Sequence, residues 1–230
     1  HCVEHFIFPV YPDPASQPEW LNILDAGVFS VVFSLFAGKS YAIFALLFGF
    51  TFYIQHSNQQ AKGKDFGYRF LWRLFLLLGF ATLNAAFFPA GDVLLLFSIV
   101  GIFLFLVRNW SNKAILIISI ICLLQPIEWF QYIANLINSQ FGLLDLKVGA
   151  MYAEVGEYTK EGNFMKFVLG NITLGQKASL LWAVGAGRFL QTAGLFMLGY
   201  LIGRKQLFIS SQANIRLWAI VLISSAIAFA

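Results

Sequence analysis

Several ionisable or amide side chains stand near the ends of apolar runs, where they are candidates for chemistry. These residues are His5, Asp25, Lys39, Asn84, Asp92, Glu128 and Arg188. A charged side chain at membrane depth costs roughly 2.5–3.5 kcal/mol on insertion scales, so such groups tend to line a cavity or pair with one another. The set predicts a polar vestibule at one end of a helix bundle. The competing interpretation is that each residue simply flanks its apolar run in the headgroup region.

His5 and Asp92 are the expected catalytic residues of this vestibule. A histidine accepts a proton near neutral pH, and a carboxylate beside it orients the ring and stabilises its charged form. Asp92 follows the Pro-Ala-Gly turn at 89–91 and is also expected to cap the next helix. His1 and His5 are four residues apart, but no third ligand has metal-binding spacing, so no metal is expected. An interfacial histidine without a role remains the alternative for His5.

Two arginines near the opposite end of a span are candidates for donor binding. Arg69 and Arg73 are four residues apart and therefore lie on one face of a helix. Guanidinium groups bind phosphate in a bidentate manner, so the pair is suited to a phosphate-bearing donor. Anchoring of a span at its basic end is the simpler explanation, and both stay open. The segment "GYLIG" (199–203) fits GxxxG and is expected to pack helices.

The composition indicates which elements hold these residues. The chain is 59% hydrophobic and 11% charged, with a mean hydropathy of +0.75. A soluble domain has about 25% charged residues. The charges gather in gaps between apolar runs, so the expected fold is an all-α, polytopic transmembrane helix bundle. Its expected surroundings are the lipid bilayer.

About six spans and one interfacial helix are expected in a single transmembrane domain. The spans are 40–56, 67–88, 92–107, 114–133, 187–203 and 215–230. The short apolar run 27–37 is expected to be an interfacial or re-entrant helix, after a proline-rich stretch too irregular for a helix. Residues 134–186 form one long connection, expected to contain short helices. Because the chain starts with His1 and ends in an apolar run, further spans are expected before residue 1 and after residue 230.

The distribution of charge predicts the orientation of the spans. Successive loops between spans are expected on alternate sides of the membrane. One side then holds a single acid, Asp65, and these cations: Lys62, Lys64, Arg69, Arg73, Arg108, Lys113, Arg204, Lys205 and Arg216. Basic loops face the cytoplasm, so the cytoplasmic segments are expected to be 57–66, 108–113 and 204–214. Residues 1–38 and 134–186 are then extracytoplasmic. The net charge of +4 therefore needs no nucleic-acid partner.

Three stretches together resemble a known family. They are "FAGKSYAIFALLFGFTFYIQ" (36–55), "YRFLWRLFLLLGFATLNAAFFPAGDVLLLFSIVGI" (68–102) and "LFMLGYLIGRKQLF" (195–208). In order and spacing they resemble the YeiB-like family of bacterial inner-membrane proteins, over most of 36–108 and 187–208. The resemblance implies a bacterial inner-membrane location and places Lys39, Arg69 and Asp92 on family motif positions. The family commonly has a histidine where this chain has Asn84.

The resemblance also implies a relation to the transmembrane acyltransferase superfamily. Members with known activity move an acyl group from a cytoplasmic thioester donor to an acceptor, often a sugar. The expected function is therefore acyl transfer from an acyl-CoA-type co-substrate, without a covalently bound cofactor, to an extracytoplasmic sugar or other small molecule. A transporter or lipid exporter, with Gln125-Pro126 and Thr192 as its polar or broken mid-span positions, is the alternative. A non-catalytic sensor is a third, and no oligomeric state is indicated.

Overall fold

The computed structural model of the chain describes residues 17–36, 39–88, 93–137, 147–160 and 162–229. All regular secondary structure in these ranges is helical, which confirms the all-α prediction for them. The chain divides into two compact units, His1–Ile43 and Phe44–Ala230.

The helix α2 (Glu19–Phe36) is the main element of the first unit. It begins well before the short helix expected at 27–37, so that expectation is wrong in its start. The physical reason lies at Pro18, whose carbonyl accepts hydrogen bonds from the backbone N–H groups of Leu21 and Asn22 at 3.0 and 3.3 Å. A proline has no N–H to satisfy and a helix-compatible φ, so it starts a helix readily.

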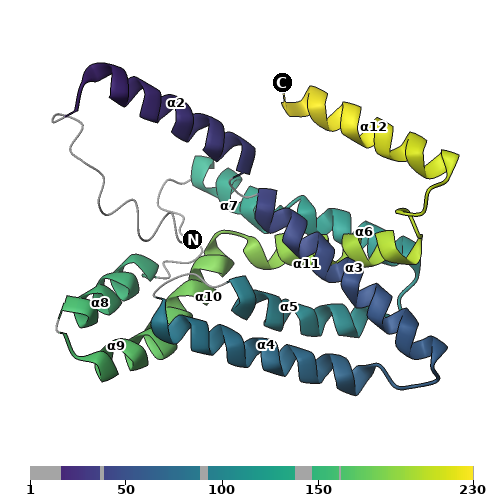
Figure 1. The fold of residues 1–230 in the computed structure, drawn as a ribbon, viewed down its shortest axis with the longest axis horizontal. Helices are drawn as coiled ribbons and strands as arrows, with labels where there is room; N and C mark the ends of the chain where they lie inside the picture. The colour runs from purple at the N-terminus through teal and green to yellow at the C-terminus, as the bar shows by residue number, and fades with distance from the viewer. Residues whose placement is uncertain (1–16, 37–38, 89–92, 138–146, 161, 230) are drawn as a thin grey trace. The chain divides into compact units, whose positions relative to one another are not determined.

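The helices of the second unit follow most of the predicted spans to within a few residues. After α3 (Lys39–Ala61), which runs from the first unit into the second, they are α4 (Gly67–Phe87), α5 (Val93–Val107), α6 (Asn112–Leu123), α7 (Pro126–Ile137), α11 (Arg188–Arg204) and α12 (Gln212–Phe229) (Figure 1). Short helices also occur in the long connection, as expected: α8 (Val148–Lys160), α9 (Phe164–Gly170), the π-helical turn η3 (Asn171–Gly175) and α10 (Gln176–Gly185).

The predicted span 114–133 is not one continuous helix. It is broken between α6 and α7 at Gln125, whose φ of 50° lies in the left-handed region. Pro126 follows, and a proline inside a helix would remove one backbone hydrogen bond and clash with the preceding turn. At the first position of a new helix the same proline is favourable. The chain therefore ends α6 and starts α7 at this point.

Two helical stretches of the described residues are long and apolar enough to cross a membrane. They are Gly67–Phe87 and Asn112–Ile137, the second of which contains the break at Gln125. Val93–Val107 and Gln212–Ile227 are apolar but shorter. About six spans were expected from the sequence, but only these two stretches of the described residues have the length and apolar composition needed to cross a membrane. One reason is that α3 ends in the polar sequence 55–60.

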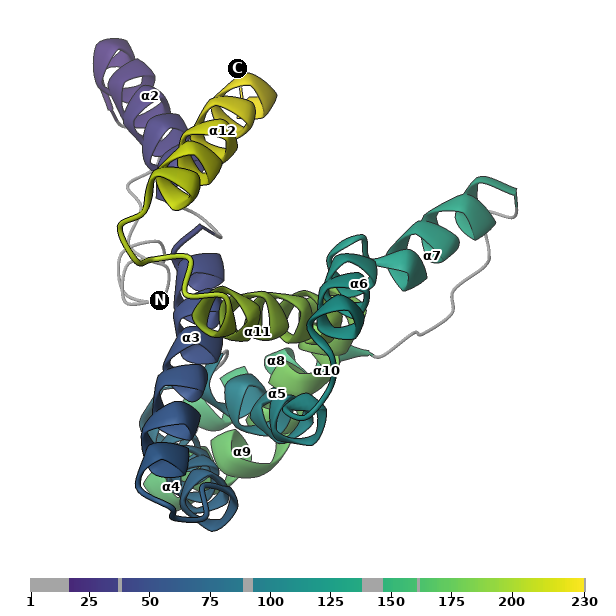
Figure 2. The same ribbon diagram turned by 90° about the vertical axis from the view of Figure 1, so that its right-hand side faces the viewer.

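Helix α11 is the central helix of the second unit, with α3 on one side and α6 on the other (Figure 2). Its glycines let these neighbours approach at backbone distance. A β-carbon at Gly199 would overlap the carbonyl oxygen of Leu46, and one at Gly203 would overlap the ring of Tyr53. On the other side, Gly194 faces Leu123 of α6. The packing role predicted for the GxxxG segment is confirmed.

The chain reverses direction at two opposite ends of this bundle. The turns after α3, α5 and α11 lie at one end, which we call the basic end because it carries most of the cations of the predicted cytoplasmic loops (Figure 1). There the Tyr200 hydroxyl donates to the carbonyl of Arg108 at 2.9 Å. The Arg204 guanidinium donates to the carbonyl of Trp110 at 2.8 Å. These bonds join the end of α11 to the turn between α5 and α6.

The substitution Gly199→Ala is expected to separate α3 from α11 and to lower the free energy of unfolding by about 1–3 kcal/mol, as overpacking does. Gly79→Ala is the matched control, because a β-carbon at Gly79 on α4 meets nothing within 4 Å. Alanine is also the better helix former, so the control should be neutral or slightly stabilising. Thermal unfolding of both variants in detergent measures the difference, and equal melting temperatures would contradict the packing role.

Candidate functional site

A group of polar residues collects where the break between α6 and α7 meets the turn before α11. We call it the junction cluster: Gln125, Glu128, Gly187, Arg188 and Gln191. The side-chain amide of Gln125 donates to the carbonyl of Gly187 at 3.3 Å. The Arg188 guanidinium donates to Oε1 of Gln191 at 2.7 Å. The cluster lies at the end of the second unit opposite the basic end.

The backbone at Gly187 lets the Glu128 carboxylate come close. Gly187 has a φ of 64°, and a β-carbon there would overlap Glu128 Oε1 and lie 2.8 Å from the amide nitrogen of Gln125. The other carboxylate oxygen, Oε2, is buried and has no hydrogen-bond partner among the described residues. Such a buried polar atom is costly unless something binds it, so the cluster has capacity for a ligand group or a water molecule.

Two of the predicted vestibule residues lie near the same junction of helices. Glu128 and Arg188 both belong to the junction cluster. Asn84 is exposed near the end of α4. It takes no part in the contact between Glu128 and Gly187. Lys39 begins α3 and belongs to the first unit, as does Asp25 of α2.

The expected catalytic residues, His5 and Asp92, lie outside the described residues. The polar residue Thr192, which the transporter alternative singled out, is fully buried. Its hydroxyl donates to the carbonyl of Arg188, one turn back in α11, at 2.6 Å. The hydroxyl proton of Thr192 is therefore used within its own helix. Sequence reasoning missed Gly187 and Gln191, although Gly187 immediately precedes the predicted vestibule residue Arg188.

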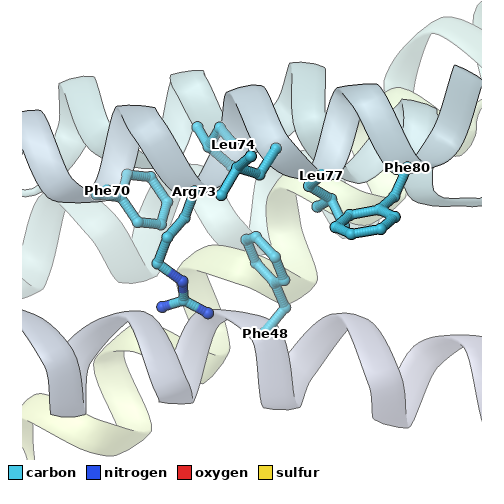
Figure 3. A pocket seen from close by; sticks show the side chains of 7 residues that line it. Phe48, Phe70, Arg73, Leu74, Leu77 and Phe80 are labelled. Carbon is cyan, nitrogen blue, oxygen red and sulfur yellow. The ribbon is translucent and has the colours of Figure 1, made fainter.

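A groove lies between α3 and α4 towards the basic end, with a volume of about 230 Å³ (Figure 3). It is lined by Phe48, Phe70, Arg73, Leu74, Leu76, Leu77 and Phe80. The Arg73 guanidinium reaches from α4 towards α3 (Figure 3). Arg73 has no hydrogen-bond or ion-pair partner in the part of the chain that the structure describes. The groove therefore combines apolar walls with one unpaired cation.

The other predicted donor-binding residue, Arg69, is exposed, as Arg73 is, but it is not part of the groove lining. Its guanidinium is 3.5 Å from the side-chain oxygen of Gln59 on α3. Asp65, in the loop between α3 and α4, accepts a hydrogen bond from the backbone N–H of Gly67 at 3.0 Å. This backbone hydrogen bond lowers the pKa of Asp65, so the carboxylate stays charged at the start of α4.

Comparisons with known proteins add one partial relative. The uncharacterized protein YxaH of Bacillus subtilis (strain 168) is 34% identical over 79 residues, which is 34% of this chain and 20% of that protein. The match thus spans about a fifth of that relative's length. No protein-family profile matches the chain, and no solved structure gives a significant match.

The substitution Gly187→Ala is expected to displace the Glu128 carboxylate and to destabilise the junction cluster. Its matched control is Gly63→Ala, because Gly63 has a similar φ of 61° but open space around its α-carbon. Both variants pay the cost of a left-handed alanine, about 1–3 kcal/mol. Only Gly187→Ala should show an additional loss in thermal unfolding. If both variants melt at the same temperature, Glu128 does not pack against Gly187.

Proposed function

We propose that this chain belongs to a multi-pass protein of the bacterial inner membrane, with about six spans, that acts as an acyltransferase. The acyl group would pass from a cytoplasmic acyl-CoA-type donor to an extracytoplasmic acceptor such as a sugar. The resemblance to the YeiB-like family and the two membrane-length apolar stretches support this proposal. The shorter apolar helices α5 and α12 are assigned as further spans in a locally thin or polar part of the bundle.

The arrangement of charged groups in the second unit carries the proposal. An unpaired cation, Arg73, stands beside an apolar groove towards the basic end, and Arg69 lies one turn away on the same helix, outside the groove. A carboxylate and a guanidinium, from Glu128 and Arg188, stand at the opposite end. A donor with phosphate and acyl parts suits the first arrangement, and a hydroxyl-bearing acceptor suits the second.

The proposed reaction needs a proton acceptor and a group that stabilises negative charge. The acceptor hydroxyl attacks the thioester carbonyl carbon, the new C–O bond forms, and the C–S bond breaks. The hydroxyl proton passes to the base and then to the departing thiolate, which leaves as CoA thiol. From the sequence alone, the proton transfer is assigned to His5 and Asp92, both of which lie outside the described residues. Glu128 and Arg188 are assigned to hold the acceptor.

A transporter or lipid exporter is a second candidate, because one observation favours it. The interruption between α6 and α7 divides one membrane-length stretch into two helices and leaves Gln125 and Glu128 beside the gap. Discontinuous helices that expose polar groups are typical of transporter binding sites. Such a site would move its ligand without a covalent step.

Acyl transfer predicts that the purified protein binds an acyl-CoA. Acetyl-CoA is the probe, measured by titration calorimetry in detergent. Wild type should bind it at micromolar levels, and Arg69→Gln should weaken binding about tenfold, the effect of losing one charge-assisted hydrogen bond. Lys205→Gln, which removes a cation at the same end, is the control and should bind as wild type.

Transfer itself is followed with radiolabelled acetyl-CoA and a panel of sugars. Glu128→Gln should lower the rate of labelled product at least tenfold, whereas Glu157→Gln should not. Glu157 is the suitable control because it is an exposed carboxylate paired with Lys160 on α8. Absence of acetyl-CoA binding by wild type would remove the acyltransferase proposal. Substrate efflux that depends on Glu128 would then support the exporter.

A further inference from the structure

We propose that the groove between α3 and α4 is a binding site for an anionic phospholipid, with one acyl chain along the groove and the phosphate on Arg73. This inference concerns Arg73 and the groove alone, and it does not rest on acyl transfer.

The size of the groove selects the kind of occupant. Its volume of about 230 Å³ exceeds a cavity of about 150 Å³ that accommodates benzene. It falls below the range of about 300–1,000 Å³ typical of pockets that enclose a drug-sized ligand. A segment of one acyl chain therefore fits, and the nucleotide part of any larger ligand would lie outside the groove.

The lining supports the same choice. Apart from the Arg73 guanidinium, every side chain that lines the groove is apolar. A nucleotide base or a sugar would lose its hydrogen bonds to water there without replacement, which is costly. An acyl chain loses none. The unpaired guanidinium supplies the single charged contact that a phosphate diester needs.

The walls are rigid on the side of the core and open on the other. The ring of Phe48 stacks on Phe196 at 4.5 Å, and the ring of Phe70 lies edge-on to Phe52 at 4.5 Å. These contacts anchor two of the walls to the bundle. In contrast, Phe80 is 63% exposed. A ligand can therefore enter from the side of the bundle without unpacking the core.

The direction of the groove agrees with that of a lipid chain. The lining residues of α4 begin at Phe70 and end at Phe80, a rise of about 15 Å at 1.5 Å per residue. α4 is long and apolar enough to cross a membrane, and a groove along a spanning helix would run roughly parallel to the acyl chains of the bilayer. Arg73 lies near the basic end of this path. Anionic lipids concentrate in the cytoplasmic leaflet, where such basic groups attract them.

Native mass spectrometry of the detergent-purified chain tests the site, with phosphatidylglycerol and phosphatidylcholine of matched acyl chains as probes. Wild type should bind phosphatidylglycerol in preference to phosphatidylcholine. Arg73→Gln should weaken phosphatidylglycerol binding about fivefold, the effect of one basic residue near the membrane surface. Arg69→Gln is the matched control, because it removes a cation one turn away that does not line the groove. It should bind as wild type.

A groove-filling variant, Leu76→Trp, tests the acyl-chain position. Leu76 is exposed at the wall, so the variant should keep its melting temperature while losing both lipids. Equal losses in Arg69→Gln and Arg73→Gln would indicate diffuse surface attraction and would overturn the proposal. So would equal binding of the two lipids by wild type, or binding of inorganic phosphate or CoA at Arg73 without phosphatidylglycerol. Acetyl-CoA titration of the same variants is scored separately, so failure of acyl transfer leaves the lipid result standing.

Discussion

The close backbone contact of α11 with its two neighbours is the interaction on which the second unit depends. Between membrane helices the hydrophobic effect supplies little, so association relies on close van der Waals packing and on hydrogen bonds between helices. Glycine makes both available here. Where Gly199 faces α3, Phe48 comes to stack on Phe196, which sets one wall of the groove. On the other face, the hydroxyl of Ser119 donates to the carbonyl of Gly194 at 2.9 Å, which holds α6 against α11 just below the junction cluster.

Most helix boundaries of the second unit could be predicted because apolar runs and charged gaps alternate cleanly. Each run must satisfy its backbone hydrogen bonds internally, and a helix is the local way to do so. The start of α2 and the break at Gln125 could not be predicted in this way. Both depend on a single proline, and a proline either begins a helix or interrupts one according to the backbone of its neighbours. The left-handed conformation of Gln125 is such a choice, and composition does not reveal it.

The candidate site was predictable residue by residue but not as an arrangement. Glu128 and Arg188 stood out because ionisable groups are costly near a membrane. The position of Glu128 beside the start of α11 depends on a long-range contact with Gly187, and that contact needs the absence of a side chain at Gly187. Likewise, the spacing of Arg69 and Arg73 predicted a shared helix face. The spacing did not predict that Arg73 would line an apolar groove while Arg69 lies beside the side chain of Gln59.

The surface of α12 is apolar and exposed over much of its length. Ile220, Leu222 and Ile227 are 65%, 70% and 73% exposed, and apolar residues surround them on the same helix. A soluble monomer rarely exposes a continuous apolar surface of this kind. A helix of 18 residues is about 27 Å long, close to the hydrocarbon thickness of about 30 Å. Hydrocarbon therefore covers such a helix at no cost. In the same solvent, the lipid proposed for the groove at Arg73 would fill the apolar space and supply the counter-charge of the guanidinium together.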